Sequence, residues 1–400
     1  MEIRPILSAL LRNRAGALLV GLQIAITLAV AANAAFIIQQ RLQKIGRPTG
    51  IDTPNTFYLY SYGYAPGYDA KATLTRDLET LRRLPGVVAA TSSNSIVLSG
   101  SGSSNAYLAT PDPKAPNIPG NYFEIGDQGL ATWNVRLLEG RNFRPEELTW
   151  RGIDNEFPRQ VIVSRTMAQA LYGTEHAVGR LVYDSSGKAA QIIGVTADMM
   201  GSWADAKHPN NIVYHPVLQN APRLLYAVRS APGRRAELML QAQAALARTG
   251  DGRFIVWVHP QEKYLQSSYL ADHRMVVFLW TIIALMVGVT ALGIVGLATF
   301  LVNARRKQIG TRRAVGARRI DIVRYFLVEN GLLTTFGSAA GVVFAFAFSY
   351  WLSNAFELPA LPVRFVVGGV VALLVLGQVA VLVPARRAAQ VPPAVATRTV

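Results

Sequence analysis

The sequence predicts an α-helical membrane protein with four transmembrane helices and one large α+β domain outside the membrane. Two observations lead to this fold class. Four apolar runs, at residues 15–38, 276–302, 326–352 and 365–383, are each close to the roughly 20 helical residues that cross a hydrocarbon core. A mixed segment, residues 42–270, separates the first run from the second and is far too long to be a loop.

Basic residues decide the orientation of these helices. Residues 303–324, between the second and third runs, carry eight Lys/Arg and one acid, and residues 1–14 and 384–400 are also basic. The positive-inside rule therefore places all three segments and both termini in the cytoplasm, and residues 42–270 on the opposite side of the membrane. The net charge of +16 comes mostly from these segments, so it reflects topology and anionic lipid rather than nucleic-acid binding.

The first run is expected to be an uncleaved anchor rather than a secretory signal. It has 24 residues, whereas the apolar core of a signal peptide has roughly 7–15. Gln39, Gln40 and Arg41 follow it without a small-residue cleavage site, so we expect a first transmembrane or stalk helix at 15–41. Residues 1–14 have helical apolar spacing, which predicts either a cytoplasmic amphipathic helix or an extension of the span.

The segment at 42–270 is expected to contain two β-α-β halves with a strand-rich insertion. The first half (55–100) has a strand at 57–62, a helix at 70–84 that Pro85 and Gly86 stop, and a strand at 87–98. The second half (222–260) has a strand at 224–228, a helix at 233–249 and a strand at 254–258. The insertion (101–215) has strands at 161–164 and 191–195 and a short helix at 166–172. These elements predict a split α+β module.

The residues indicate no enzymatic active site in this chain. Cysteine is absent, which excludes disulfides and thiolate chemistry. No G-x-x-x-x-G-K-[ST] phosphate loop occurs, and the nearest candidate, residues 173–180, ends in Gly-Arg. The Ser/Gly-rich residues 99–104 lack a G-x-S-x-G elbow. Five histidines match no zinc spacing and are expected to be turn or surface residues: His176, His208, His215, His259 and His273. We therefore expect no metal or cofactor in this chain.

The basic segment carries a family resemblance. Residues 303–324 read NARRKQIGTRRAVGARRIDIVR and resemble the cytoplasmic loop of MacB/FtsX-type ABC transporter permeases, which usually reads ERTREIGIRKALGA. Three further landmarks follow the family order. Residues 121–143 (NYFEIGDQGLATWNVRLLEGRNF) and 161–199 are similar to segments of the family's periplasmic domain, and residues 383–396 (VPARRAAQVPPAVA) are similar to its ending PARRAARLDPIEAL. The resemblance therefore covers the whole chain.

The resemblance implies a permease subunit of the mechanotransmission type, without a fused ATPase. It implies a MacB-like periplasmic core domain at 42–270 and an FtsX-like permease domain at 271–400. It also implies a separate ABC ATPase dimer that binds ATP and Mg, and a coupling loop at 303–324 that docks on it. The residues expected to dock are Gln308, Ile309, Gly310, Arg312, Arg313, Ala314, Val315, Gly316, Ala317 and Arg318.

Two features of the loop qualify this expectation. Gln308 stands where the family usually has Glu, so one carboxylate contact is missing and the chain fits one half of a heterodimer. The plainer alternative is a topological anchor, in which Ile309, Ala314, Val315 and Ile320 form an amphipathic helix beneath the membrane.

Polar residues inside the predicted spans are expected to pair within the bundle. Glu329 matches the Glu of the family's FLxEA sequence, and it either holds the coupling helix to the third span or snorkels to the interface. Interhelical hydrogen bonds are expected from Gln23, Thr27, Asn33 and Gln378.

The family resemblance leaves several functions open. The first is ATP-driven efflux or export of an antibiotic, peptide or envelope substrate from the inner membrane. The alternatives are a lipoprotein-releasing permease and an FtsX-like regulator of a cell-wall hydrolase or sensor. The expected partners are the ATPase dimer, a second permease copy (identical or similar) packed through spans one and two, and membrane lipid. A periplasmic adaptor and an outer-membrane channel are further candidates.

Overall fold

The computed structural model describes residues 14–112, 114–152, 157–249, 252–356 and 359–392. The predicted amphipathic helix at residues 1–14 therefore lies almost entirely outside the described residues, as does the end of the basic tail. The chain forms two compact units. One combines Met1–Gly46 with Asp272–Val400 and is helical, and the other is Arg47–Ala271 and is built on two main sheets.

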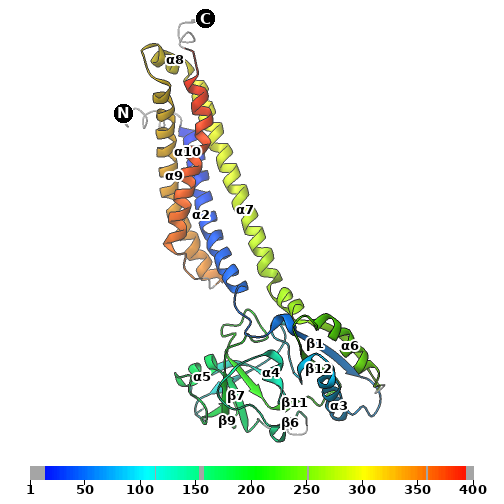
Figure 1. The fold of residues 1–400 in the computed structure, drawn as a ribbon. Coiled ribbons are helices and arrows are strands. Elements are labelled where there is room, and N and C mark those ends of the chain that lie inside the picture. Colours follow the sequence, from blue (N-terminus) through cyan, green and yellow to red (C-terminus); the bar gives the residue numbers. More distant parts are fainter. Residues whose placement is uncertain (1–13, 113, 153–156, 250–251, 357–358, 393–400) are drawn as a thin grey trace. The chain divides into compact units, whose positions relative to one another are not determined.

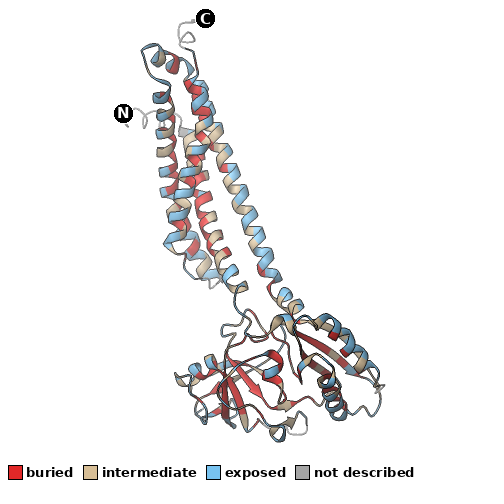
Figure 2. Ribbon diagram, in the orientation of Figure 1, coloured by how far each residue is buried: buried red, intermediate tan, exposed pale blue. Residues whose placement is uncertain are grey.

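Long apolar helices make up the helical unit. They are α2 (Arg14–Ile45), α7 (Gln261–Ala304, of which Asp272 onward belongs to this unit), α9 (Arg319–Phe356) and α10 (Val363–Ala389). Each is long and apolar enough to cross a membrane, and each contains one of the four predicted spans. Figure 1 shows α2, α9 and α10 running side by side, and Figure 2 shows buried residues along the faces they share.

Glycines let α9 approach α2 closely. A Cβ added at Gly341 would lie 3.0 Å from the Ala25 Cα and carbonyl oxygen, and one at Gly337 would lie 2.9 Å from the Gly21 carbonyl oxygen. Helices in lipid gain packing energy from such close approach, because lipid tails offer no hydrophobic driving force between them. These two positions therefore require glycine for the observed contact.

The predicted interhelical hydrogen bonds are confirmed at three of four positions. Thr27 and Thr290 join α2 to α7 through their hydroxyls at 2.8 Å. Asn33 Nδ2 donates to the Ala345 carbonyl at 3.1 Å, and Gln378 Nε2 donates to the Leu327 carbonyl at 3.3 Å. Gln23 instead fills the space beside Gly293, where an added Cβ would meet its Oε1 at 2.6 Å.

An ion-pair cluster also joins α2 to α7 at the ends of their apolar stretches. Arg41 Nη1 lies 2.6 Å from Asp272 Oδ1, and Lys44 Nζ lies 2.7 Å from Asp272 Oδ2. The Asp272 side chain is only 3% exposed, so two cations neutralise one buried carboxylate. Removing Asp272 would leave both cations without this charge in a partly buried place.

The first sheet of the second unit interleaves the two predicted β-α-β halves. Its order is β13-β1-β12-β2, with every neighbouring pair antiparallel. Each half therefore accepts a strand of the other half between its own two strands, as the predicted split module requires. The helices α3 and α6 contribute apolar side chains to the core of one face. The elements are β1 (Thr56–Gly63), α3 (Ala70–Arg83), β2 (Val87–Ser92), β12 (Arg223–Ser230), α6 (Arg235–Ala247) and β13 (Arg253–Pro260).

The insertion forms a second sheet of seven strands in the order β5-β9-β7-β10-β4-β3-β8. The predicted strands at 161–164 and 191–195 and the helix at 166–172 are confirmed as β7, β9 and α5. The strands are β3 (Ser103–Leu108), β4 (Ile118–Glu124), β5 (Leu137–Gly140), β7 (Gln160–Ser164), β8 (Leu181–Asp184), β9 (Ala189–Thr196) and β10 (Ile212–His215). The short elements are α4 (Gly129–Trp133), α5 (Arg165–Tyr172), the pair β6 (Thr149–Trp150) and β11 (Val217–Leu218), and the 3-10 turns Thr53–Asn55 and Pro145–Glu147.

Two predictions for this unit are wrong in detail. The strand predicted at 87–98 ends at Ser92, because the chain then turns and Leu98, fully buried, adopts a φ of +57°. His215 is not a turn or surface residue. It stacks on Tyr122 with ring centroids 4.8 Å apart, and its Nε2 lies 3.1 Å from the Tyr107 hydroxyl. Burial lowers the pKa of His215 to about 3, so it is a neutral core side chain.

Candidate functional site

The basic segment of residues 303–324 forms a short helix and a tight corner. Helix α8 (Arg306–Ala314) is followed by Val315 as its C-cap, and the next residue, Gly316, has a φ of +102°. The Ala317 amide then donates to the Arg312 carbonyl at 3.0 Å, which closes the end of the helix. Helix α9 begins at Arg319, and Asp321 accepts a hydrogen bond from the Arg318 amide at 3.0 Å, which satisfies one free donor of its first turn.

The inner face of α8 is anchored to the rest of the helical unit. Ile309 is 5% exposed and belongs to an apolar cluster with Ile322, Ala385 and Ala388. Arg313 Nη1 donates to the Val391 carbonyl at 2.7 Å, which attaches α8 to the chain that follows α10. The helix therefore cannot move independently of α9 and α10 without losing these contacts.

A buried ion pair connects the beginning of α8 to α9. Arg305 Nη1 lies 2.9 Å and 3.0 Å from the two carboxylate oxygens of Glu329, whose side chain is 3% exposed. The same nitrogen donates to the Tyr325 hydroxyl at 3.1 Å, and the Arg312 guanidinium lies 5.2 Å above the Tyr325 ring. Glu329 thus points into the unit and is paired, which is the first of the two arrangements expected for it.

The outer face of α8 and the corner are exposed and mixed in character. Apart from Ile309 and Gly310, which are buried, the expected docking residues are exposed or half-buried. Val315 is 84% exposed and Ile320 is 57% exposed, in the midst of basic residues. The predicted amphipathic helix through Ile309, Ala314, Val315 and Ile320 is wrong, because α8 ends at Ala314 and only Ile309 of the four is buried.

Sequence reasoning missed the partners of this site. Arg305, Tyr325 and the Arg313–Val391 bond did not stand out from the surrounding basic and apolar residues. The one available signal was that a carboxylate inside a span requires a cation. Of the eight basic residues in the segment, only the contacts of the folded chain identify Arg305 as that cation.

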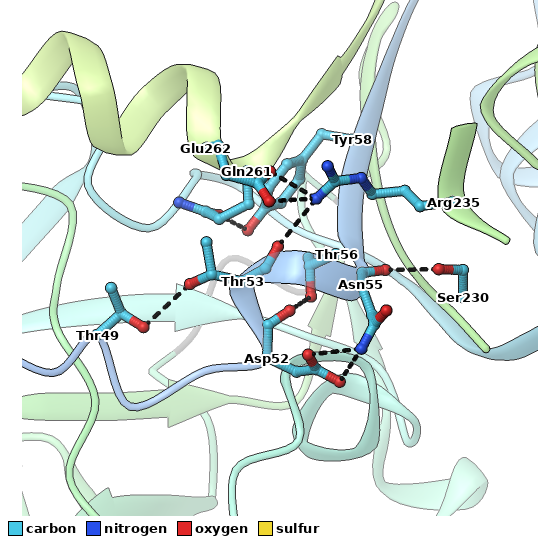
Figure 3. Close-up of polar contacts among 10 residues, drawn as sticks. All are labelled: Thr49, Asp52, Thr53, Asn55, Thr56, Tyr58, Ser230, Arg235, Gln261 and Glu262. Atoms are coloured by element: carbon cyan, nitrogen blue, oxygen red, sulfur yellow. Dashed lines mark hydrogen bonds and ion pairs between the residues drawn. The ribbon is translucent and has the colours of Figure 1, made fainter. Parts of the chain in front are cut away.

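The second unit contains a polar junction where the chain enters it after α2 and leaves it through α7 (Figure 3). Arg235 Nη1 lies 2.6 Å and 2.5 Å from the two Glu262 oxygens at the start of α7, and 3.3 Å from the Thr53 carbonyl of the entering segment. The hydroxyls of Thr49 and Thr53 lie 3.1 Å apart, and Ser230 donates to the Asn55 carbonyl at 3.1 Å.

The first turn of α7 also holds the interior of this unit. The Tyr58 hydroxyl donates to Gln261 Oε1 at 2.8 Å and accepts from Trp133 Nε1 at 3.1 Å. Gln261 Nε2 in turn donates to the Val97 carbonyl at 2.8 Å. Burial raises the pKa of Tyr58, so its hydroxyl remains a donor at any physiological pH. These bonds fix the start of α7 to strand β1 and to the chain that follows β2.

Among the residues that the structure describes, no group of three or more His, Asp or Glu side chains is placed to hold a metal ion.

The chain matches two known domain families. Residues 20–247 match the MacB-like periplasmic core domain, and residues 280–393 match the FtsX-like permease C-terminal domain. The first match alone covers more than half of the chain. The chain belongs to the MacB-type family of ABC transporter permeases, and the four apolar helices with this core domain make it a multi-pass membrane protein with a periplasmic domain. The predicted fold class and family are confirmed.

Curated relatives are similar over much of the chain. The pyoverdine export ATP-binding/permease protein PvdT of Pseudomonas aeruginosa is 25% identical over 361 residues, which are 86% of this chain and 50% of that protein. The macrolide export ATP-binding/permease protein MacB of Bordetella avium is 26% identical over 248 residues, 60% of this chain and 36% of that protein. The chain thus spans half the length or less of these relatives. The periplasmic region of MacB from Actinobacillus actinomycetemcomitans aligns over 56% of this chain and 97% of its own, at 14% identity and a TM-score of 0.33.

Proposed function

We propose that this chain is the permease subunit of an ABC transporter and is itself non-catalytic. A separate ATPase dimer binds ATP and Mg, and this chain converts its closure into conformational work in the periplasm. The observation that carries the proposal is the geometry of α8. Its inner face is fixed by Ile309 and by the Arg305–Glu329 pair, and its corner presents Val315 to the solvent.

The docking surface would be the exposed corner around Val315. An apolar side chain that is 84% exposed among arginines costs nothing to desolvate when a partner covers it, and it fits an apolar pocket with an acidic rim. Gln308, exposed on α8, would donate or accept a neutral hydrogen bond where the family usually offers a carboxylate. Ile309 and Gly310 would serve the site from inside by anchoring α8 rather than by touching the partner.

Force applied at α8 would travel through α7. This helix begins in the polar junction with Gln261 and ends at Ala304, next to Arg305. The Arg41–Asp272–Lys44 cluster would make α2 follow α7, so both helices would move as one stalk. The junction bonds from Gln261 and Glu262 would then pass the displacement to the strands of the periplasmic domain.

A second permease copy would pack against α2 and α7. Only 11% of the apolar stretch of α7 is buried within the chain, against 39% for α2 and 33% for α9. Large apolar side chains such as Phe278, Leu285 and Leu292 are more than half exposed on it. One permease offers one coupling corner, so an ATPase dimer requires two copies, identical or similar. Membrane lipid would cover the faces that remain.

We propose export of an antibiotic, peptide or envelope substrate from the inner membrane, with both termini in the cytoplasm. The names of the relatives, which export macrolides or pyoverdine, support this class. Lipoprotein release and regulation of a cell-wall hydrolase or sensor are the competing functions of the same machinery. A periplasmic adaptor and an outer-membrane channel would complete an efflux route and would be absent from the other two.

Site-specific photo-cross-linking tests the ATPase contact. A photoreactive amino acid at Val315 should capture an ABC-type ATPase in native membranes. The matched control is Leu240, an apolar residue of α6 that is 71% exposed in the periplasmic domain and should capture none. If Val315 captures no ATPase while the chain is correctly inserted, the corner is only a topological anchor. The other proteins captured at Leu240 would separate an adaptor from a hydrolase or a lipoprotein.

A further inference from the structure

An apolar groove lies on the surface of the helical unit between α9 and α10. It has a volume of about 430 Å³, and nearly all of its lining surface is apolar. Its walls are formed by Leu327 of α9 and by Leu374, Val375, Gln378, Val379 and Leu382 of α10. Gln378 Nε2 donates to the Leu327 carbonyl at 3.3 Å, so the polar residue of the lining joins the two walls. We call this feature the α9–α10 groove.

The length and position of the groove fit one lipid acyl chain. Leu374 and Leu382 are eight residues apart, which is about 12 Å along a helix. One leaflet of the hydrocarbon core is about 15 Å deep. Val375 and Val379 are each 58% exposed, so the groove opens away from the bundle, and α10 is long and apolar enough to cross the membrane. The groove therefore spans most of one leaflet and faces its acyl chains.

Two arginines lie at one end of the groove. Arg324 precedes Leu327 by three residues on α9, and Arg386 follows Leu382 by four residues on α10. Each arginine therefore lies on the same helix face as its neighbour in the groove. Because α9 ends shortly before α10 begins, the first turns of α9 lie beside the last turns of α10 (Figure 1). Both arginines are exposed, so their guanidinium groups are available at the end of the groove.

The structure provides no counter-ion for these two arginines. Among the residues that it describes, neither arginine makes a hydrogen bond or an ion pair, whereas Arg305 is paired with Glu329. Asp321, the acid in the first turn of α9, accepts a hydrogen bond from the Arg318 amide. Guanidinium groups bind phosphate oxygens through charge-assisted hydrogen bonds. Two such groups beside an apolar groove are complementary to an anionic headgroup that carries an acyl chain.

We infer that the α9–α10 groove binds one anionic phospholipid. One acyl chain lies in the groove against Val375 and Val379, and the phosphate group accepts hydrogen bonds from Arg324 and Arg386. The lipid joins α9 to α10 at the end next to α8. A helix of a second protein is a poorer occupant, because an apolar helix face would leave the two arginines without a counter-charge. This inference stands on the helical unit alone and does not depend on the proposed function.

Native mass spectrometry of the full chain in a neutral detergent tests the headgroup. Phosphatidylglycerol and phosphatidylcholine with identical acyl chains are titrated separately. We expect one phosphatidylglycerol to bind per chain, with an affinity about tenfold or more above that of phosphatidylcholine, because only the anionic lipid leaves a net charge to pair with the arginines. Equal affinities of the unmodified chain for the two lipids would overturn the inference.

Two double variants locate that preference. Arg324→Gln/Arg386→Gln should abolish it. The matched control is Arg319→Gln/Arg387→Gln, which removes the same charge from exposed positions of the same two helices. Arg387 lies about 100° around the helix from Arg386, and Arg319 lies about 140° from Arg324. The control should therefore keep the preference, and an equal loss in both double variants would contradict a site at the end of the groove.

A second pair of variants tests the groove itself. Val379→Trp fills the groove, whereas Val367→Trp places the same side chain outside it on α10, and the two valines are 58% and 55% exposed. We expect Val379→Trp to lower the affinity for phosphatidylglycerol about tenfold or more through overpacking, and Val367→Trp to change it by no more than about twofold. If Val379→Trp leaves the affinity unchanged, the arginines bind lipid without the groove and the inference is refuted. If it instead dissociates a lipid-free dimer of the chain, the groove is a protein contact and the inference is refuted as well.

Discussion

The Arg305–Glu329 pair allows a quantitative prediction. Glu329→Gln removes the charge and keeps the shape, so Arg305 remains in a mostly buried place with Tyr325 as its remaining polar contact. Removing one partner of a buried pair typically costs about 3–5 kcal/mol, because the other charge is left uncompensated. The Arg305 side chain is 16% exposed, so we expect the low end, about 3 kcal/mol. For a unit of this size that corresponds to a Tm lower by roughly 6–12 °C.

Two further variants distinguish the loss of the ion pair from the loss of one negative charge. The matched control is Asp321→Asn, which neutralises an exposed carboxylate on the same helix and should cost no more than about 1 kcal/mol. The double variant Arg305→Met/Glu329→Leu removes both charges and should recover most of the loss, since apolar pairs replace buried ion pairs at little cost. The measurement is thermal unfolding of the full chain in nanodiscs, analysed as a double-mutant cycle.

The same variants report on coupling. If the pair holds α8 to α9 and the coupling is as we propose, Glu329→Gln should retain ATPase cross-linking at Val315 but reduce transport-linked ATP hydrolysis, whereas Asp321→Asn should retain both. Our reasoning would be refuted by Glu329→Gln shifting Tm no more than Asp321→Asn does. That result would mean that Glu329 is solvated in the membrane interface rather than paired.

Four further predictions follow from the structure. Val315→Asp should leave membrane levels normal and weaken ATPase co-purification about tenfold or more, because it would bury an unpaired charge in the docking surface that we propose. Tyr58→Phe should lower the free energy of unfolding by about 1–3 kcal/mol in denaturant titration, since an indole and an amide lose their shared partner. His215 has a lowered pKa of about 3 in the folded chain, so the unfolded chain binds its proton more readily. Stability should therefore fall from about pH 6.5 towards pH 3 by up to ~1.4 kcal/mol per unit, and His215→Phe should remove that slope in unfolding measured across this range. Cysteines at Gly187 and Arg318 should be labelled by impermeant reagents from opposite sides of the membrane, and labelling of Gly187→Cys from the cytoplasm would contradict the topology.

The positions of most helices and strands could be predicted from local sequence, but the pairing of the strands in the sheets could not. The four apolar runs located the four long helices, and the helical spacing at 70–84 agrees with α3 (Ala70–Arg83). The polar extensions of the long helices were not predicted: α7 begins at Gln261, ahead of the run at 276–302, and α9 begins at Arg319, ahead of the run at 326–352. The interleaved sheet order depends on contacts between residues such as Thr56 and Arg229, which no local pattern encodes. The strand end at Ser92 was missed because the following residues keep the same apolar and small character while the chain turns.

The candidate site, too, could be predicted from the sequence only in part. The basic composition located the corner, and the unfavourable position of a carboxylate in a span singled out Glu329. The choice of Arg305 as its partner, the burial of Ile309 and the exposure of Val315 depend on how α8 lies against α9 and α10, and they required the folded chain. His215 was misplaced because a lone histidine carries no sequence signal that distinguishes a stacked core position from a surface turn.

The interleaving of the first sheet has a consequence for biosynthesis. Strand β12 lies between β1 and β2, yet it is made about 130 residues after β2 ends. At about 5–20 residues per second, β1 and β2 wait on the order of 7–26 seconds before the strand that joins them exists. During that interval both β1 and β2 have unpaired backbone N–H and C=O groups along an edge in the periplasm. Exposed strand edges of this kind promote aggregation. The seven-stranded sheet of the insertion is complete before β12 emerges, so it can fold first and bring the two halves together.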